Sequence, residues 1–500
     1  MTRNELELYP NFTGELEAIR ETGITKEILQ KIIQKHRPNS LYNRSLYNRY
    51  KAIYGGVPIF DRQPRYEEEA NPINNRINND FFSEIVDFKT GYFAGEPISY
   101  SYSETDESEE STGGVQGVDK AAEALTDFTT RNNMFGVDME VTKNASVYGY
   151  SGRLFYIDKE GMERVMPVPG YETIILSDTK IAEPEYAIRY YEVSDINDTK
   201  QWIVEFYDNK NVTTYKGDLG SLTEIETRPH MFDYCPLQGI ANNAERMGDA
   251  EKVLELIDGY DRVVSDCSNE IEAFVHALMV VGVNVDNNVI TEAQKNGVLI
   301  VPQVGSNAVD DPVKWVTKNI DDAFSEHHLQ RLEDNIYRFS KTPNLNKDLF
   351  SSSSGKALKF RLHQLETKCA MFESCMTDAA IHMWRLLASS WAKKGIKFDP
   401  LQVVMDFKRN FPTETLENAQ AAQALIAAGL SKKQAWAIAI PEIDDPDYAE
   451  EMANAEKEDN MALYEAAQQG FNNNDSGNEQ NDDEQDETDK EKKNVNKDLQ

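Results

Sequence analysis

The chain has 500 residues, of which 40% are hydrophobic, and a formal net charge of −34 at pH 7. This length exceeds a single compact core, so we expect two or more domains or one elongated subunit. The acidic balance argues against general binding to nucleic acids or to anionic membranes, so any contact with DNA has to be local.

The N-terminus and the cysteines indicate the compartment. The first residues carry Glu5 and Glu7 and no apolar stretch, so we expect no signal peptide. Nowhere do about eighteen consecutive apolar residues occur, and no membrane-spanning helix is expected. The four cysteines form no CxxC pair and stand beside no histidine at zinc-ligand spacing, which is typical of a protein made in a reducing cytoplasm.

Two helices are predicted near the start of the chain. From residue 25 to about 54, Ile28, Ile32 and Ile33 recur at helical spacing with basic residues between them. A second helix is expected over 78–93, where an aromatic stripe lies on one face. Glycine and proline after that stripe end the helix.

Between Pro97 and Pro236 the hydrophobic period changes to two, which predicts antiparallel strands. The alternating residues are Tyr186, Ile188, Tyr190, Trp202, Val204 and Phe206. Turns are expected at 208–210 and 216–218, and an exposed acidic loop at 104–114.

Two long proline-free segments show a four-three alternation of apolar residues, the seam of a helix packed along its length. The first seam consists of Val253, Ile257, Tyr260, Val264, Cys267, Ile271, Phe274 and Leu278. The second consists of Leu358, Leu362, Leu365, Cys369, Phe372, Met376, Ala379, Met383 and Leu386. We expect each helix to run for roughly 40 to 60 Å and therefore predict a tall subunit or packing between subunits.

A short insert separates these helices. Within 283–315, Val298 to Val301 predicts a buried strand, and the insert is expected to form a small α/β cap on a helical stalk. A third helix is predicted over 321–339, followed by a loop rich in Ser and Asn.

The C-terminal part is expected to hold three Ala-rich helices, at 415–428, 431–439 and 446–469, with Ser431 as an N-cap. From Asn472 to Lys490 no aromatic or aliphatic hydrophobe occurs, which predicts a disordered acidic tail over 470–500.

The sequence gives little sign of catalytic chemistry. No GxxxxGK[ST] loop is present, which argues against an ATP-driven motor. The stretch from Asn284 to Asn288 resembles a calcium loop only faintly, because Val289 stands where glycine is needed. His327 and His328, near His363, form the best histidine cluster, but adjacent histidines on a helix point to different faces. We therefore predict no metal, no cofactor and no catalytic residue.

One region departs from the acidic balance. Between residues 341 and 368 there are six basic residues against two acidic ones, a local net charge of +4. The basic residues are Lys341, Lys347, Lys356, Lys359, Arg361 and Lys368. They could meet phosphates, or they could pair with a helix bearing Asp258 and Asp261, and the sequence leaves both interpretations open. A second basic run, 26–65, fits a solvated helix face better.

The order of these segments resembles the portal, or head-to-tail connector, proteins of siphophages that infect Gram-positive bacteria. The resemblance covers about 24–456. The stretches that carry it are Tyr50 to Tyr54, Asn71 to Arg76 and on from Asp87 through Phe93 to Pro97, Leu256 to Tyr260, Ser265 to Phe274, and Ser353 to Lys359.

The resemblance implies an α+β subunit with named parts. They are a wing at 1–237 with 396–411, a stem helix at 238–282, a clip at 283–320, a second stem helix at 321–340, a tunnel loop at 341–354, a long helix at 355–395 and a helical crown at 412–469. The loop and the adjoining helix place Lys341, Lys347, Lys356, Lys359 and Arg361 at the DNA channel. The stem seam is expected to consist of Val253, Ile257, Tyr260, Val264, Ile271 and Phe274.

The resemblance also implies a function and partners. Portal proteins form a dodecameric ring at one capsid vertex of the virion, through which double-stranded DNA is packaged, retained and ejected. They bind terminase, the head-completion adaptor, scaffold and the major capsid protein. The alternatives are another structural head or adaptor protein, and a metal-dependent DNA-processing enzyme.

Overall fold

The structure is a computed structural model. It describes residues 10–64, 73–103, 115–177, 184–194, 196, 198–275, 279–281, 298–300, 313–315, 322–344, 355–410 and 415–439. The chain divides into two compact units, Met1–Phe411 and Pro412–Gln500. Helices and mostly antiparallel sheets occur together in the first unit, which confirms the predicted α+β class.

The first unit begins with α1 (Thr13–Thr22) and α2 (Lys26–Tyr50). The Thr25 hydroxyl accepts a hydrogen bond of 3.3 Å from the backbone N–H of Ile28, so α2 starts where a threonine can satisfy one of its free donors. The helix ends four residues before the predicted boundary, because the chain turns at Ala52, which has a φ of +51°.

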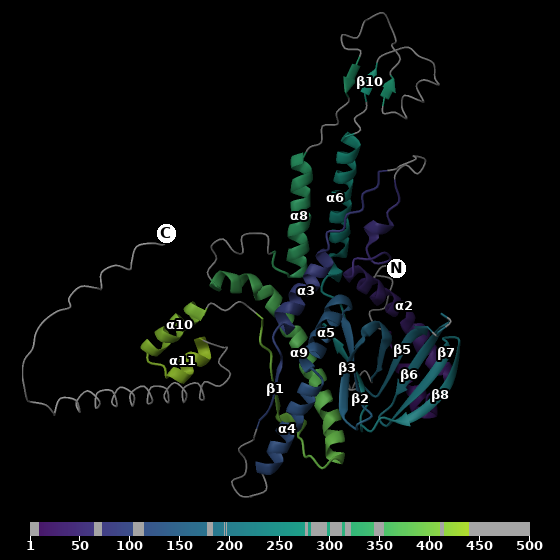
Figure 1. The fold of residues 1–500 in the computed structure, drawn as a ribbon, viewed down its shortest axis with the longest axis vertical. Helices are drawn as coiled ribbons and strands as arrows, with labels where there is room; N and C mark the ends of the chain where they lie inside the picture. Colours follow the sequence, from purple (N-terminus) through teal and green to yellow (C-terminus); the bar gives the residue numbers. More distant parts are fainter. Residues whose placement is uncertain are drawn as a thin grey trace, which may run out of the picture. The chain divides into compact units, whose positions relative to one another are not determined.

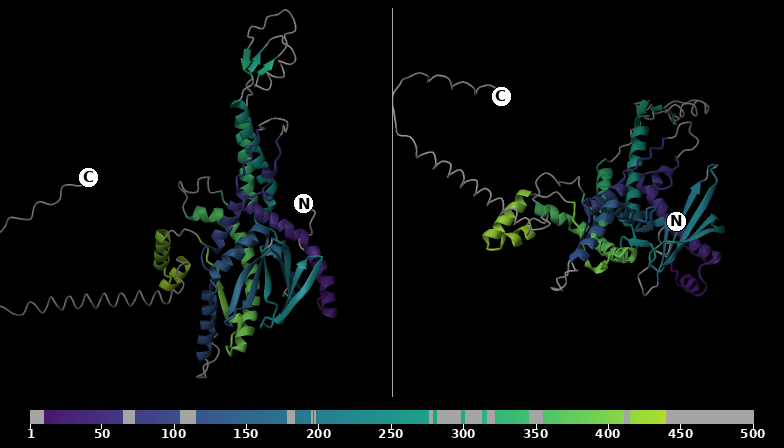
Figure 2. Two further views of the ribbon diagram at one scale, coloured as in Figure 1. Left: turned by 45° about the vertical axis from the view of Figure 1, so that its right-hand side comes forward. Right: turned by 60° about the horizontal axis from the view of Figure 1, so that its bottom comes forward.

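A five-stranded antiparallel sheet has the order β4-β5-β6-β7-β8. Its strands are β4 (Thr173–Leu176), β5 (Tyr186–Ser194), β6 (Lys200–Tyr207), β7 (Asn211–Asp218) and β8 (Ser221–Pro229). α1 and α2 cover one face of it, and buried side chains such as Leu29, Ile188 and Val204 fill the space between (Figures 1 and 2). The alternation predicted for β5 and β6 is confirmed. The turn at 208–210 is also confirmed, whereas 216–218 belongs to β7 and the chain turns just after it.

The interpretation of 97–236 as strands alone is wrong, because α4 (Val115–Arg131) and α5 (Met134–Tyr148) lie in this region. α5 is buried on most of its surface, so it shows little of the polar and apolar alternation that marks an exposed helix. Its Val, Thr and Ser residues have weak helix propensity, and tertiary packing overrides that preference. The acidic loop predicted for 104–114 lies outside the described residues.

Two smaller sheets join distant parts of the chain. β2 (Tyr150–Ile157) pairs with both β3 (Glu163–Pro169) and β9 (Leu237–Ala241). β1 (Ser99–Tyr102) pairs in antiparallel register with β13 (Val403–Asp406), Ser99 standing opposite Asp406. The segment after the long helix therefore pairs with residues 99–102, about 300 positions earlier in the sequence.

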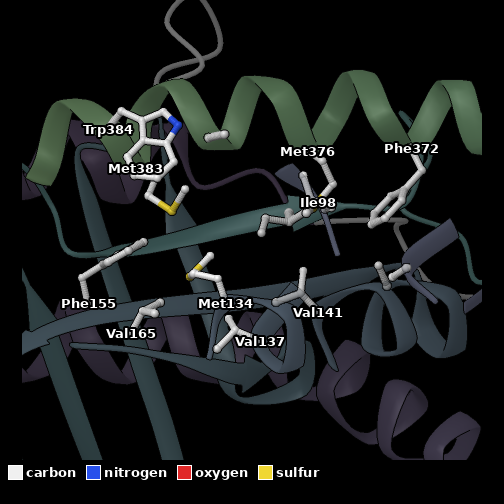
Figure 3. Close-up of a cluster of buried hydrophobic side chains, with 14 of the residues drawn as sticks. Ile98, Met134, Val137, Val141, Phe155, Val165, Phe372, Met376, Met383 and Trp384 are labelled. Carbon is white, nitrogen blue, oxygen red and sulfur yellow. The ribbon is translucent and has the colours of Figure 1, made fainter. Parts of the chain in front are cut away.

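α9 (Gly355–Lys393) is the longest helix, with 39 residues, or about 58 Å. Its side chains Phe372, Met376, Met383 and Trp384 point into a core shared with α5, β2 and β3 (Figure 3). The predicted seam is confirmed from Leu362 to Leu386, except that Ala380 is buried and Ala379 only half-buried; the Leu358 side chain lies outside the description. A buried Trp or Phe contributes about 3 kcal/mol or more of stability, so this face dominates the core.

α6 (Leu254–Val275) follows a short 3-10 turn at Glu251–Val253, and α8 (Asp322–Ser340) packs beside it (Figure 1). With 22 residues α6 measures about 33 Å, which is shorter than predicted. Between them in sequence stand β10 (Met279–Val281), β11 (Val298–Ile300) and β12 (Val313–Trp315), in the order β11-β10-β12. The predicted strand is confirmed over Val298–Ile300, whereas Val301 and the predicted burial lie outside the description. The third helix is confirmed.

The second unit contains α10 (Thr415–Ala427) and α11 (Lys432–Ala439). The Ser431 hydroxyl accepts a 3.3 Å hydrogen bond from the N–H of Gln434, which confirms Ser431 as the N-cap of α11. The helix predicted at 446–469 and the acidic tail lie outside the described residues.

A buried histidine makes stability depend on pH. His36 of α2 is 1% exposed and lies 2.8 Å, through Nδ1, from the Tyr190 hydroxyl. Burial lowers the pKa of His36 to about 3, and the charges of Arg246 and Arg37 add to this effect. Below about pH 6.5 the histidine therefore binds a proton in the unfolded chain but stays neutral in the folded chain. Stability falls as the pH drops from 6.5 towards 3.

We predict that the free energy of unfolding of the wild type falls by up to about 1.4 kcal/mol per pH unit below pH 6.5 because of His36. His36→Gln should lack this part of the pH dependence. Thermal unfolding midpoints at pH 7.0, 6.0 and 5.5 give the comparison. His327→Gln, a change of an exposed histidine on α8, is the control and should follow the wild type. Parallel pH profiles for the wild type and His36→Gln would contradict the assignment.

Candidate channel segment and its supports

The predicted DNA-contacting residues stand at the two ends of one segment. Lys341 is exposed and directly follows α8. Lys347 lies outside the described residues. Lys356, Lys359 and Arg361 belong to the first turns of α9, where the structure describes the helix but not these side chains.

The segment leaves α8 through a tightly bonded turn. Lys341 has a φ of +60°, and the N–H of Thr342 donates to the Tyr337 carbonyl at 3.1 Å, the pattern that closes a helix with a left-handed residue. Asn344 donates through Nδ2 to Glu333 Oε1 at 2.6 Å. The hydroxyl of Tyr337 in turn donates to Glu84 of α3 (Phe81–Ala94) at 2.8 Å. Residues 341–344 are therefore fixed against α8.

A buried charged cluster lies beside this turn. Lys368 Nζ is 2.8 Å from the Ser340 carbonyl oxygen and 2.9 Å from Asp249 Oδ1. Lys89 Nζ is 3.0 Å from Asp249 Oδ2, and both of these side chains are about 1% exposed or less. Lys89 also donates to Asn242 Oδ1 and lies 4.6 Å from the centre of the Phe372 ring. The cluster joins α3, α8, α9 and the loop before α6.

The electrostatics of the cluster favour the ionised carboxylate. Burial by itself would raise the pKa of Asp249, but the ammonium groups of Lys368 and Lys89 outweigh burial and hold that pKa below its ordinary value. Loss of one partner of a buried ion pair strongly destabilises the protein, because the remaining charge stays buried without a counter-charge. The contacts therefore specify where these four elements meet.

The base of α6 is held by a ladder of hydrogen bonds. The backbone N–H groups of Asn79, Ile77 and Asn75 donate to Asp261 Oδ1 at 3.0 Å, Ser265 Oγ at 3.0 Å and Asn269 Oδ1 at 2.6 Å. Every second N–H along the chain thus meets every fourth residue of the helix. Two residues of an extended chain span about 6.6 Å, and four residues of a helix span about 6 Å, so the two spacings nearly match.

The contacts of Asp258 and Asp261 bear on the alternative that the sequence left open. Asp258 is paired with Arg49 of α2, and Asp261 accepts bonds from Asn79. Lys368 is nevertheless paired with a carboxylate, that of Asp249. One of the six basic residues therefore has a structural role, and its partner is one that the sequence did not suggest.

Comparisons with known proteins identify the family. A family model described as phage portal protein, SPP1 Gp6-like, matches residues 29–464. The chain belongs to this family. It is 24% identical over 432 residues to the portal protein of Clostridium phage phiCD119, covering 82% of this chain and 90% of that protein. It is also 24% identical over 460 residues to the portal protein of Bacillus phage SPP1, covering 87% and 86% respectively.

As a phage portal protein, the chain is a virion component of the DNA-packaging channel at the capsid vertex, and it is not an enzyme. Among the described residues, no three His, Cys, Asp or Glu side chains gather at metal-binding distance, and all four cysteines are free. His328 packs on Phe324, with the ring centres 6.5 Å apart. Within the same described ranges, no helix has the length and apolarity that a membrane span requires.

The predicted stem seam is buried at its base only. Val253 and Ile257 are buried against α3 and α8, and Tyr260 stacks edge-on against Phe81 at 4.9 Å. Val264 is half-buried. Ile271 is 63% exposed, and Phe324 on the neighbouring helix α8 is 71% exposed. The Phe274 side chain lies outside the description. The parts of α6 and α8 beyond this buried base therefore present large apolar side chains to their surroundings.

Sequence reasoning missed Lys89, Asp249 and the ladder. A signal for Lys89 was present, since this lysine interrupts an otherwise apolar helix face and a buried cation requires a buried anion. Asp261, Ser265 and Asn269 also recur at intervals of four, but nothing in the sequence points to the backbone that they bind.

We predict that Asp261→Ala destabilises the protein by about 1–3 kcal/mol, because it leaves the buried N–H of Asn79 without an acceptor. Asp261→Asn keeps the acceptor oxygen and should stay close to the wild type. Thermal unfolding and amide hydrogen exchange of residues 75–79 measure the effect. The ladder would be refuted by equal exchange in Asp261→Ala and Asp261→Asn.

Proposed function

We propose that this portal protein forms a closed, dodecameric ring in which the stem helices of adjacent copies contact each other around the channel. The observation that carries the proposal is the exposure of Ile271 and Phe324 on α6 and α8 above a buried base. Exposed apolar surface of this kind marks a contact with another macromolecule. In a ring the obvious occupant is the next copy of the same chain.

The proposed parts follow the element order of the portal family. α6 and α8 form the stem, β10, β11 and β12 form the clip, and α10 and α11 belong to the crown. Residues 396–411 belong with the wing, which is supported by the pairing of β13 with β1. Arg409 adds to this support, because it binds Glu366 at 3.0 Å and Glu373 at 2.6 Å on α9.

The charge distribution suits a channel for sliding DNA. A net charge of −34 on each copy repels phosphates and disfavours tight binding. We propose that the segment 341–354 stands at the narrowest part, where Lys341, Lys347, Lys356, Lys359 and Arg361 meet passing phosphates weakly. Lys368, the sixth basic residue of 341–368, is not in this set, and its ammonium group binds Ser340 and Asp249.

The proposed ring also has docking partners. We propose that it binds terminase during packaging, the head-completion adaptor afterwards, and scaffold and major capsid protein during assembly. The support for these partners is membership of the portal family over residues 29–464.

We predict that replacing Lys347 and Lys356 together by Gln spares folding and ring assembly but changes packaged DNA per particle. Phosphate contacts release counterions, so the difference from the wild type should shrink as salt rises. Procapsids assembled with each portal and packaged at two salt concentrations provide the measurement.

The matched control is Lys159→Gln with Lys216→Gln, which removes two exposed charges from the strand region. This control should package like the wild type at both salt concentrations. Wild-type packaging and retention by the Lys347→Gln, Lys356→Gln portal would show that these lysines are ordinary surface charges.

A further inference from the structure

Lys368, a half-buried lysine of α9, contacts the end of another helix. Its ammonium group binds the carbonyl oxygen of Ser340, the last residue of α8, at 2.8 Å. The final carbonyls of a helix lack partners within the helix and carry partial negative charge. A lysine from another helix is well suited to satisfy one of them. Lys368 of α9 therefore holds the end of α8.

Lys368 differs from Lys89 in what it links to Asp249. Both lysines pair with this carboxylate, Lys368 with Oδ1 at 2.9 Å and Lys89 with Oδ2 at 3.0 Å. Lys89 also donates to Asn242, whereas Lys368 also binds the Ser340 carbonyl at 2.8 Å. Lys368 therefore connects the buried carboxylate to the end of α8, where residues 341–344 begin.

The contact stands at one end of the connection between α8 and α9. The chain leaves α8 at Ser340, and α9 begins at Gly355, 13 residues before Lys368 and so about 20 Å from it along the helix axis. A connection of about 14 residues can span some 46 Å, about twice that axial distance. The separation of the two helices therefore leaves the exit from α8 to be fixed by local contacts such as this one.

We propose that Lys368 is a positioning residue of the portal channel: by binding the Ser340 carbonyl from α9, it fixes the point and direction from which the segment 341–354 leaves the stem. The inference rests on the proposed function of that segment. Lys368 itself does not contact DNA, since its side chain is 18% exposed and its ammonium group is engaged on both sides.

The chain offers a close control for a test of this role. Lys393, also on α9, donates to the Met231 carbonyl at 2.8 Å and to Asp233 Oδ1 at 2.8 Å. It thus reproduces the pattern of one backbone carbonyl and one aspartate, far along the helix from Lys368. Lys368→Met, Lys368→Arg and Lys393→Met can therefore be compared as assembled rings.

The first readout is amide hydrogen exchange. Lys368→Met should make the last turn of α8 and the Thr342 amide exchange about two- to fivefold faster, because the helix end loses a cationic partner. Lys368→Arg, which keeps a cationic donor, should stay near the wild type, and Lys393→Met should not affect α8. The second readout is packaged DNA per particle, which should change for Lys368→Met and not for Lys393→Met.

Each outcome decides a separate point. Unchanged exchange in Lys368→Met overturns the anchoring role, whatever the segment does. Failure of Lys368→Met to fold or assemble overturns it too, since it would make Lys368 essential for neutralising the cluster. Faster exchange with wild-type packaging overturns the link to the channel. The Lys347→Gln, Lys356→Gln portal tests the proposed function independently, so the two failures are distinguishable.

Discussion

The apolar face of α9 is the constraint on which the first unit depends. From Leu362 to Trp391 it supplies a nearly continuous row of buried side chains, and α5, β2 and β3 are arranged to cover it (Figure 3). Because no single neighbouring element is as long as α9, several shorter elements together cover its apolar face. The return of β13 to β1 has the same cause, since this ribbon packs its tyrosines and Met405 against the same row.

The charged cluster around Asp249 marks the place where hydrophobic packing gives way to specific pairing. Apolar contacts let helices slide at small cost, whereas a buried carboxylate with two ammonium partners tolerates few arrangements. Here α3, α8 and α9 meet the loop before α6. The ladder from Asp261 to Asn269 adds a fixed position for α6 along the segment 75–79. α6 and α8 therefore start from defined positions, and Ile271 and Phe324 beyond this base are exposed.

Local patterns predicted the parts of this structure that have a simple exposure period. The four-three seam of α9 and the alternation of β5 and β6 are examples, because the large apolar side chains recur with the period of the element on the face that packs against a helix or sheet. α5 escaped prediction because nearly all of its sides are covered. The contact of Lys368 with Ser340 and Asp249 could not be predicted, since its members are far apart in the sequence and no local pattern records which buried charges will meet. The predicted DNA-contacting residues remain a prediction carried by the family and by local charge.

The central claim is that the exposed apolar residues of α6 and α8 are covered by adjacent copies of the chain around a channel. Single-particle electron microscopy of the assembled protein tests it most directly. The account predicts closed rings with a central hole, in which Ile271 and Phe324 of each copy are buried against the stem of the next. Particles that remain monomeric at all protein and salt concentrations, or rings in which these two residues face solvent, would contradict it.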